Sequence, residues 1–176
     1  MTDTETALIV GAGGGLSASL ARRFAKEGVK IALAARDAAK LSALCEETGA
    51  MAYSCDASDP AAVADLFSSV TSDLGEPDIA VYNASNRARG PVTDLDPEAV
   101  LTAIKISCFG GFLVAQQAAK QMVARGRGAI FFTGASAGVK GFANSSSFAM
   151  GKFGLRGLAQ ALARELHPQN IHIGHF

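Results

Sequence analysis

The sequence has little that marks a nucleic-acid-binding or membrane protein. Sixteen Lys and Arg residues balance sixteen Asp and Glu residues, so the formal net charge is zero, and no basic run appears. This balance argues against nucleic acid or an anionic membrane surface as the main partner. No apolar run reaches the length of a transmembrane helix, and the N-terminus lacks the charge and apolar length of a signal peptide. These features predict a cytoplasmic protein.

Residues that bind metals or form disulfides are also scarce. The three cysteines, Cys45, Cys55 and Cys108, are far apart and odd in number, which predicts reduced thiols packed as small apolar groups. The three histidines lie near the C-terminus without a cysteine or a convincing carboxylate partner. We therefore expect no metal site.

The chain does have a regular alternation of strand and helix patterns. Its 176 residues, 49% of them hydrophobic, are enough for one domain with a sizeable core. Short apolar runs predict strands at 7–10, 30–35, 50–55, 78–83, 128–134 and 170–176. Helical spacing and end signals predict helices at 16–28, 37–49, 59–75, 96–126 and 147–167, with Asp37 and Asp59 as N-caps.

This alternation predicts an α/β fold. Continuous apolar strands joined by helices form a parallel sheet that helices cover on both faces. Right-handed crossovers then give a Rossmann-like, doubly wound sheet of six strands, with its ligand site at the C-terminal ends of the strands. We expect residues 1–176 to form a single dinucleotide-binding domain.

A glycine-rich turn, "GAGGGLS", follows the first predicted strand and leads into the first helix. Glycines there let backbone N–H groups approach a pyrophosphate at a helix N-terminus. The third glycine of the ordinary dinucleotide fingerprint is replaced by Leu16, so a flexible turn is the alternative. The residues predicted to contact the dinucleotide in this turn are Gly11, Gly13, Gly14, Gly15 and Leu16.

The end of the second strand indicates which dinucleotide binds. An acid there favours NAD, whereas an arginine pairs with the 2′-phosphate of NADP. Ala35 and Arg36 therefore predict NADP, with NAD as the alternative. Asp37 competes as an acid, although helix capping is its expected role. Arg36 as a merely solvated surface residue is the other interpretation.

The ends of the third and fourth strands supply further candidates. Asp56, next to Ala57, could accept a hydrogen bond from the adenine amino group, or serve only as a turn residue. Asn83, Ala84 and Ser85 follow the fourth strand and could lie near the cofactor.

The segments "VGAGGGLS", "CDAS", "YNAS" and "FAMGK" occur in the order and spacing of the short-chain dehydrogenase/reductase family, which the chain resembles from Ala7 to Phe176. The resemblance implies an NAD(P)-dependent oxidoreductase that assembles into a homo-dimer or homo-tetramer. Family members usually continue through a substrate-binding loop and a seventh strand, and this sequence ends before them.

The catalytic positions depart from the family pattern. Lys152 matches the family's lysine, which binds the nicotinamide ribose and lowers the tyrosine pKa. Phe148 stands where the family has the proton-transferring tyrosine, and Ala135 stands at its serine, with Ser136 as the adjacent hydroxyl. Ser107 aligns with the family's asparagine. A snorkelling helix lysine is the alternative for Lys152.

Two hypotheses of function follow. The first is an active oxidoreductase that prefers NADP(H), acts on a small carbonyl compound or alcohol, and handles the proton in an altered way. The proton would then move through a substrate group, a water held by Lys152, or a hydroxyl of Ser136, Ser145, Ser146 or Ser147. The second is a catalytically silent dinucleotide-binding sensor or assembly protein.

Overall fold

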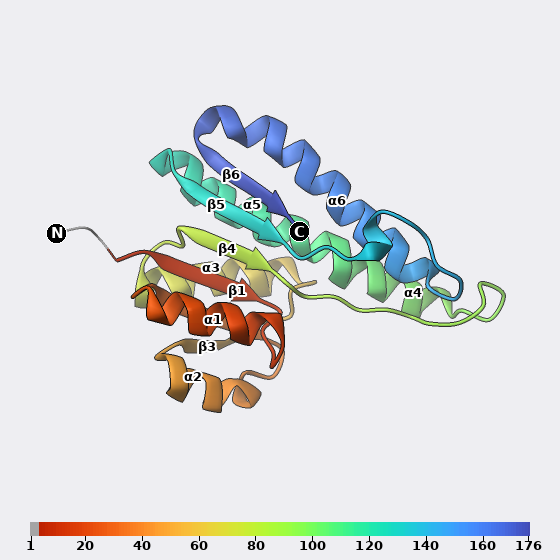
Figure 1. The fold of residues 1–176 in the computed structure, drawn as a ribbon, viewed down its shortest axis with the longest axis horizontal. Helices are drawn as coiled ribbons and strands as arrows, with labels where there is room; N and C mark the ends of the chain where they lie inside the picture. The colour runs from red at the N-terminus through yellow and green to blue at the C-terminus, as the bar shows by residue number, and fades with distance from the viewer. Residues whose placement is uncertain (1–3) are drawn as a thin grey trace.

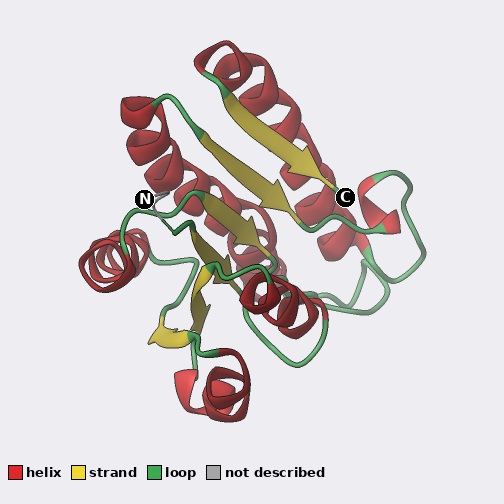
Figure 2. Cartoon of the chain, turned by 60° about the vertical axis from the view of Figure 1, so that its left-hand side comes forward, coloured by secondary structure: helices red, strands yellow, loops and turns green. Residues whose placement is uncertain are grey.

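The computed structural model describes residues 4–176, which form one six-stranded parallel sheet flanked by helices (Figures 1 and 2). The strand order is β3-β2-β1-β4-β5-β6, and this confirms the predicted doubly wound fold. The strands are β1 (Thr6–Val10), β2 (Lys30–Ala35), β3 (Met51–Ser54), β4 (Ile79–Tyr82), β5 (Gly128–Phe132) and β6 (Ile171–His175).

The helices divide between the two faces of the sheet. The α-helices are α1 (Leu16–Lys26), α2 (Ser42–Thr48), α3 (Pro60–Leu74), α4 (Pro97–Ile104), α5 (Gly110–Arg125) and α6 (Ser146–Leu166). Short 3-10 segments are η1 (Ala38–Leu41), η3 (Ser136–Gly138) and η4 (His167–Gln169). One apolar core joins the sheet to α3, α5 and α6, and a second joins the opposite face to α1 and α2.

The central strand shows why the sheet has two buried faces. β1 reads TALIV and is buried at all five positions. Because side chains alternate along a strand, Leu8 and Val10 enter the core beneath α3 and α5, whereas Ile9 enters the core beneath α1. Ile9 pairs in register with Leu33 of β2 and Val81 of β4.

The helix starts confirm one predicted cap and correct another. Asp59 caps α3 by accepting a hydrogen bond from the Ala61 N–H at 2.9 Å, and Pro60 occupies the first turn. Asp37 precedes the 3-10 segment η1 and makes no capping bond. Its carboxylate instead pairs with Lys40 at 3.1 Å.

The predicted helix 96–126 is interrupted by a π-helical turn, η2 (Lys105–Phe109), between α4 and α5. The Tyr82 hydroxyl donates to the Ile106 carbonyl in this turn. Gly110 follows at once, and a Cβ there would overlap the Tyr82 hydroxyl and the Ala57 carbonyl. The absence of a side chain at Gly110 therefore lets the helix pass close over the end of β4.

The same helix corrects the expectation about membrane segments. Residues Pro97–Arg125 contain a stretch with a mean hydropathy of 1.6, which is apolar and long enough for a membrane span. This is weak evidence for a membrane, because the core helices of soluble proteins pass the same test. In this structure α5 packs against β4, β5 and α6.

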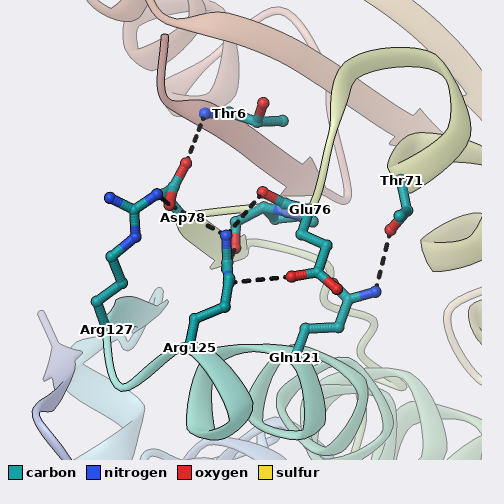
Figure 3. Close-up of polar contacts among 8 residues, drawn as sticks. Thr6, Thr71, Glu76, Asp78, Gln121, Arg125 and Arg127 are labelled. Carbon is teal, nitrogen blue, oxygen red and sulfur yellow. Dashed lines mark hydrogen bonds and ion pairs between the residues drawn. The ribbon is translucent and has the colours of Figure 1, made fainter. Parts of the chain in front are cut away.

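An ionic cluster lies at the N-terminal ends of β1 and β4 (Figure 3). The Asp78 carboxylate accepts a hydrogen bond from the Thr6 N–H at 3.1 Å and pairs with Arg125 at 3.2 Å and Arg127 at 3.3 Å. Arg125 also pairs with Glu76 at 3.1 Å. The cluster ties β1 and β4 to the end of α5, so its role is structural.

Candidate functional site: a cleft at the strand ends

A cleft of about 530 Å³ opens at the C-terminal ends of β1, β2, β3 and β4. Its walls come from the glycine turn, the end of β2, the turn after β3 and the segment after β4, which is 83–96. The predicted cofactor-binding residues that line it are Gly11, Gly13, Gly14, Arg36, Asp56, Ala57, Asn83, Ala84 and Ser85. Segments far apart in the sequence thus meet in one place, as the doubly wound topology predicts.

The glycines of the turn have two different roles. Gly11 has a φ of +83°, and a Cβ there would overlap the backbone nitrogen of Ala84, so this glycine lets β1 and β4 approach each other. Gly13, Gly14 and Gly15 face open space, because a Cβ at any of them meets no atom within 4 Å. The turn therefore leaves room in front of the α1 N-terminus, where backbone N–H groups and the helix dipole favour a phosphate.

Asn83 and Ser17 hold the glycine turn in place. The Asn83 amide donates to the Ser17 hydroxyl at 2.8 Å and to the Gly11 carbonyl at 3.3 Å. The Ser17 hydroxyl donates to the same carbonyl at 3.2 Å. The side chain of Asn83 thus supports the turn from behind, which sequence reasoning did not foresee.

Charged groups gather around the end of β2. Arg36 is exposed and lines the cleft together with Asp37, Lys40 and Asp56. Asp56 accepts hydrogen bonds from the Ser58 N–H at 2.9 Å and the Ser58 hydroxyl at 2.7 Å. These bonds, and to a lesser degree the charge of Arg36, lower the pKa of Asp56, which stays ionised at neutral pH. Positive and negative side chains thus lie side by side at the end of β2.

A second cleft, of about 490 Å³, lies between the segment after β4 and the connection from β5 to α6. It brings together Phe148, Ala135 and Ser136, three of the predicted catalytic positions. The Arg87 guanidinium lies over the Phe148 ring, 3.9 Å from its centre. A benzyl ring can neither donate nor accept a proton, so the chemistry of this cleft depends on the groups around it.

Lys152 is buried one turn beyond Phe148 on α6. It is 3% exposed, and its ammonium donates to the Thr133 carbonyl at 2.7 Å, 5.8 Å from the centre of the Phe148 ring. Burial, and secondarily the charge of Arg87, lower the pKa of Lys152 from 10.5 to about 8. The side chain does not reach solvent, so the snorkelling interpretation is wrong.

Replacement of Lys152 by Met should change the pH dependence of stability. Because burial lowers the pKa of Lys152 in the folded protein to about 8, the unfolded chain binds more protons between about pH 8 and pH 10.5. The unaltered protein therefore gains stability across this window, whereas the desolvation cost is fully present below about pH 8. We expect the unaltered protein to gain about 2 kcal/mol relative to Lys152→Met between pH 7 and pH 10 in urea unfolding. A stability difference that stays constant with pH would contradict this.

Two buried serines tie the segment after β4 to the helices. The Ser107 hydroxyl accepts from the Asn86 N–H at 3.0 Å and donates to the Asn86 carbonyl at 2.9 Å. The Ser147 hydroxyl does the same with Ala88, at 3.0 Å and 2.8 Å. Both serines are fully buried, so Ser107, predicted at a catalytic position, positions a loop here.

Four of the predicted site residues lie outside both clefts. Lys152, Ser107, Gly15 and Leu16 line neither of the two clefts. Sequence reasoning missed Arg87, which covers Phe148, although its place just after a predicted strand end was a signal for it. No group of three or more His, Cys, Asp or Glu residues that could hold a metal ion lies together within residues 4–176.

The comparisons with known proteins agree with this geometry. The family model described as short chain dehydrogenase matches residues 5–175. The chain belongs to this family. Its members are oxidoreductases, and the match extends from the first strand to the last.

Individual family members match over nearly the whole of this chain. A short-chain dehydrogenase/reductase of Armillaria gallica is 33% identical over 98% of this chain and 69% of its own length. A solved short-chain dehydrogenase from Rhodopseudomonas palustris is 32% identical, with a TM-score of 0.93, over 97% of this chain and 82% of that one. A metagenomic short-chain oxidoreductase solved in complex with NADP is 28% identical, with a TM-score of 0.93, over 97% and 80%. The chain thus spans about two thirds of the length of its curated relatives.

Proposed function

We propose that residues 1–176 form the dinucleotide-binding Rossmann domain of an oxidoreductase that prefers NADP(H) over NAD(H). Its substrate is a small carbonyl compound or alcohol. The main observation in its support is the first cleft, where the open glycine turn, Arg36 and the segment after β4 meet at the strand ends. The NADP complex of the metagenomic family member supports the choice of cofactor.

The residues of the first cleft fit a dinucleotide. The space before Gly13, Gly14 and Gly15 suits a pyrophosphate at the α1 N-terminus, and Arg36 suits a 2′-phosphate. Lys152 would hold the nicotinamide ribose through its ammonium. The bound nicotinamide supplies the hydride chemistry, and the protein supplies binding, orientation and protons.

We propose that the proton a tyrosine would otherwise supply comes from a hydroxyl or a water molecule in the second cleft. Ser136 and Ser145 line the second cleft beside Phe148 and can relay the proton, as can a water molecule. Ser147 is unsuited to this role, because its hydroxyl is bound to a backbone carbonyl.

Cofactor preference tests the proposed function directly. NADPH should bind about tenfold to a hundredfold more tightly than NADH, because a charge-assisted pair to phosphate contributes about 1.5–3 kcal/mol. Arg36→Ala should remove most of this preference while leaving NADH binding nearly unchanged, as measured by fluorescence titration. Arg23→Ala, an exposed arginine of α1 that pairs with Glu27, is the matched control. Equal affinities in the unaltered protein would refute the preference.

A silent dinucleotide sensor is the alternative, supported by the three altered catalytic positions. Titration of NADPH and a turnover assay with carbonyl and enone substrates separate the two. Binding without any NADPH consumption across such a panel favours the sensor, whereas turnover with any substrate class favours the enzyme.

We also propose that the chain forms a homo-dimer, alone or within a tetramer. Exposed apolar side chains gather on the helical layer of α4 to α6, and they are Leu101, Phe109, Phe112, Met150 and Phe153. The rings of Phe109 and Phe112 stack with centres 6.1 Å apart. Sedimentation should show a dimer that Phe112→Glu dissociates, because burying an unpaired charge is costly. A concentration-independent monomer would contradict this assembly.

We propose a cytoplasmic location on the basis of the cysteines. Cys45, Cys55 and Cys108 are free thiols among the described residues, and burial raises the pKa of each. Free thiols of this kind are typical of proteins in a reducing compartment.

A further inference from the structure

The second cleft carries two arginines, Arg87 and Arg89, that the dinucleotide site does not use. We propose that they bind the oxyanion of the substrate, a carboxylate or a phosphate, on the same molecule that exchanges hydride with the nicotinamide. That the bound molecule is also the one that exchanges hydride rests on the proposed function. The binding of an oxyanion to the cleft can be tested without it.

The charge around this cleft is positive and uncompensated. Neither Arg87 nor Arg89 forms an ion pair within residues 4–176, and no Asp or Glu is among the described residues that line the cleft. Asp96 and Glu98 share a shallower hollow with Arg87 at the start of α4 but do not pair with it. A guanidinium that lacks a carboxylate partner and borders a cavity attracts anions.

The backbone that carries the two arginines is held at alternate residues. Ser107 binds both backbone groups of Asn86, and Ser147 binds both backbone groups of Ala88. Farther along, the Gly90 N–H donates to the Asn144 carbonyl at 3.2 Å, across the cleft. Arg87 and Arg89 alternate with the two anchored residues, and both border the cleft. The backbone positions of these two exposed arginines are therefore set by the fold. Figure 1 shows this segment and the connection from β5 to α6 at the same end of the molecule.

The Phe148 ring supports the Arg87 guanidinium. The guanidinium carbon lies 3.9 Å from the ring centre, and the ring is only 9% exposed. A cation above an aromatic face is attracted by it, and stacking leaves the N–H groups at the guanidinium edge free to form hydrogen bonds. No side-chain hydrogen bond of Arg87 occurs within the described part of the chain, so its planar fork is free to bind an oxyanion. Phe148 thus has a role that needs no hydroxyl, which is to support the Arg87 guanidinium.

Binding of three matched probes tests the site. The probes are phenylglyoxylate, its methyl ester and phenacyl phosphate, which share a phenyl ketone and differ in charge. Calorimetric titrations are run on the unaltered protein, both free and saturated with NADPH. We expect at least one anion to bind about tenfold to a hundredfold more tightly than the neutral ester, with an affinity that falls as salt rises. The tighter of the two anions identifies the group as carboxylate or phosphate.

Variants place the anion in the second cleft. Arg87→Gln and Arg89→Gln should each weaken its binding about tenfold or more, whereas Arg164→Gln should not. Arg164 is an exposed arginine of α6 whose guanidinium donates to the carbonyl of Gln160 on the same helix. In the unaltered protein the bound anion should also raise the pKa of Lys152, because it offsets the charge of Arg87.

The outcomes that overturn the proposal are distinct from those that overturn the proposed function. Equal binding of ester and anions, failure of both anions to bind, or unchanged affinity in both arginine variants refutes the oxyanion site. Anion binding that Arg36→Gln abolishes and Arg87→Gln leaves intact assigns the anion to the first cleft, and also refutes it. Anion binding that depends on Arg87, in a protein that fails to bind NADPH, supports the site and refutes the proposed function alone.

Discussion

NADPH-dependent reduction of a diketone should rise by about 10²–10⁴-fold when Phe148→Tyr and Ala135→Ser are combined. The unaltered protein should reduce the same compound slowly. A tyrosine hydroxyl would supply the general acid, and the serine would orient the substrate carbonyl. The Lys152 ammonium and the Arg87 guanidinium lie 5.8 Å and 3.9 Å from the ring centre, so both would favour the phenolate and lower the pKa of the new tyrosine.

Single-turnover measurements with bound NADPH check this expectation. Phe148→Tyr alone should help little, because Ala135 offers no hydroxyl. Adding Lys152→Met to the double variant should remove most of the gain, since the buried ammonium no longer favours the phenolate. Rapid reduction by the unaltered protein that persists in Lys152→Ala would show that the chemistry belongs to other residues. No gain in a double variant that still binds NADPH would show that the cleft does not admit a neutral carbonyl substrate.

Gly15→Val should weaken NADPH binding by about a hundredfold or more and leave the fold intact. A Cβ at Gly15, the N-cap of α1, meets no atom of the protein within 4 Å, so the added side chain fits without a clash at the helix N-terminus. A pyrophosphate would then lose its close approach to the backbone N–H groups, and each such bond to a charged group contributes about 1.5–3 kcal/mol. We expect the free energy of unfolding to change by less than about 1 kcal/mol.

Two comparisons make this prediction specific. Ala64→Val adds a similar side chain on the exposed face of α3 and should leave NADPH binding unchanged. Gly11→Val should instead prevent folding, because Gly11 has a φ of +83° and a Cβ there overlaps the Ala84 backbone. Normal NADPH affinity in a folded Gly15→Val protein would mean that the glycine turn is a turn only.

The fold was predictable because its determinants are local. Apolar runs such as TALIV are typical of parallel strands buried on both faces, and Asp59 followed by Pro60 is a residue pair that marks a helix start. The strand-end rule then indicated which segments meet at one edge. It brought the glycine turn, Arg36 and Asn83 together correctly, since all of these directly follow strands.

The rest of the site depends on contacts between distant segments, which no local pattern shows. The π-helical turn forms where the Tyr82 hydroxyl, at the end of β4, donates to the Ile106 carbonyl. The placement of Arg87 over Phe148 requires the segment after β4 to fold back onto α6. Asp37 was predicted as a cap by its position alone, and the 3-10 turn that follows it gave it Lys40 as a partner instead. The catalytic roles of Lys152, Ala135 and Ser136 stay predictions.

The serine anchors of the segment after β4 have an evolutionary consequence. Ser107 and Ser147 form hydrogen bonds only with the backbone of Asn86 and Ala88. The backbone path of the segment therefore does not depend on the side chains at positions 87 and 89. Those two positions can change identity while the segment keeps its path over the end of the sheet. Relatives with the same anchors could therefore diverge in the charge of the molecules they accept through one or two substitutions, without rebuilding the domain that carries them.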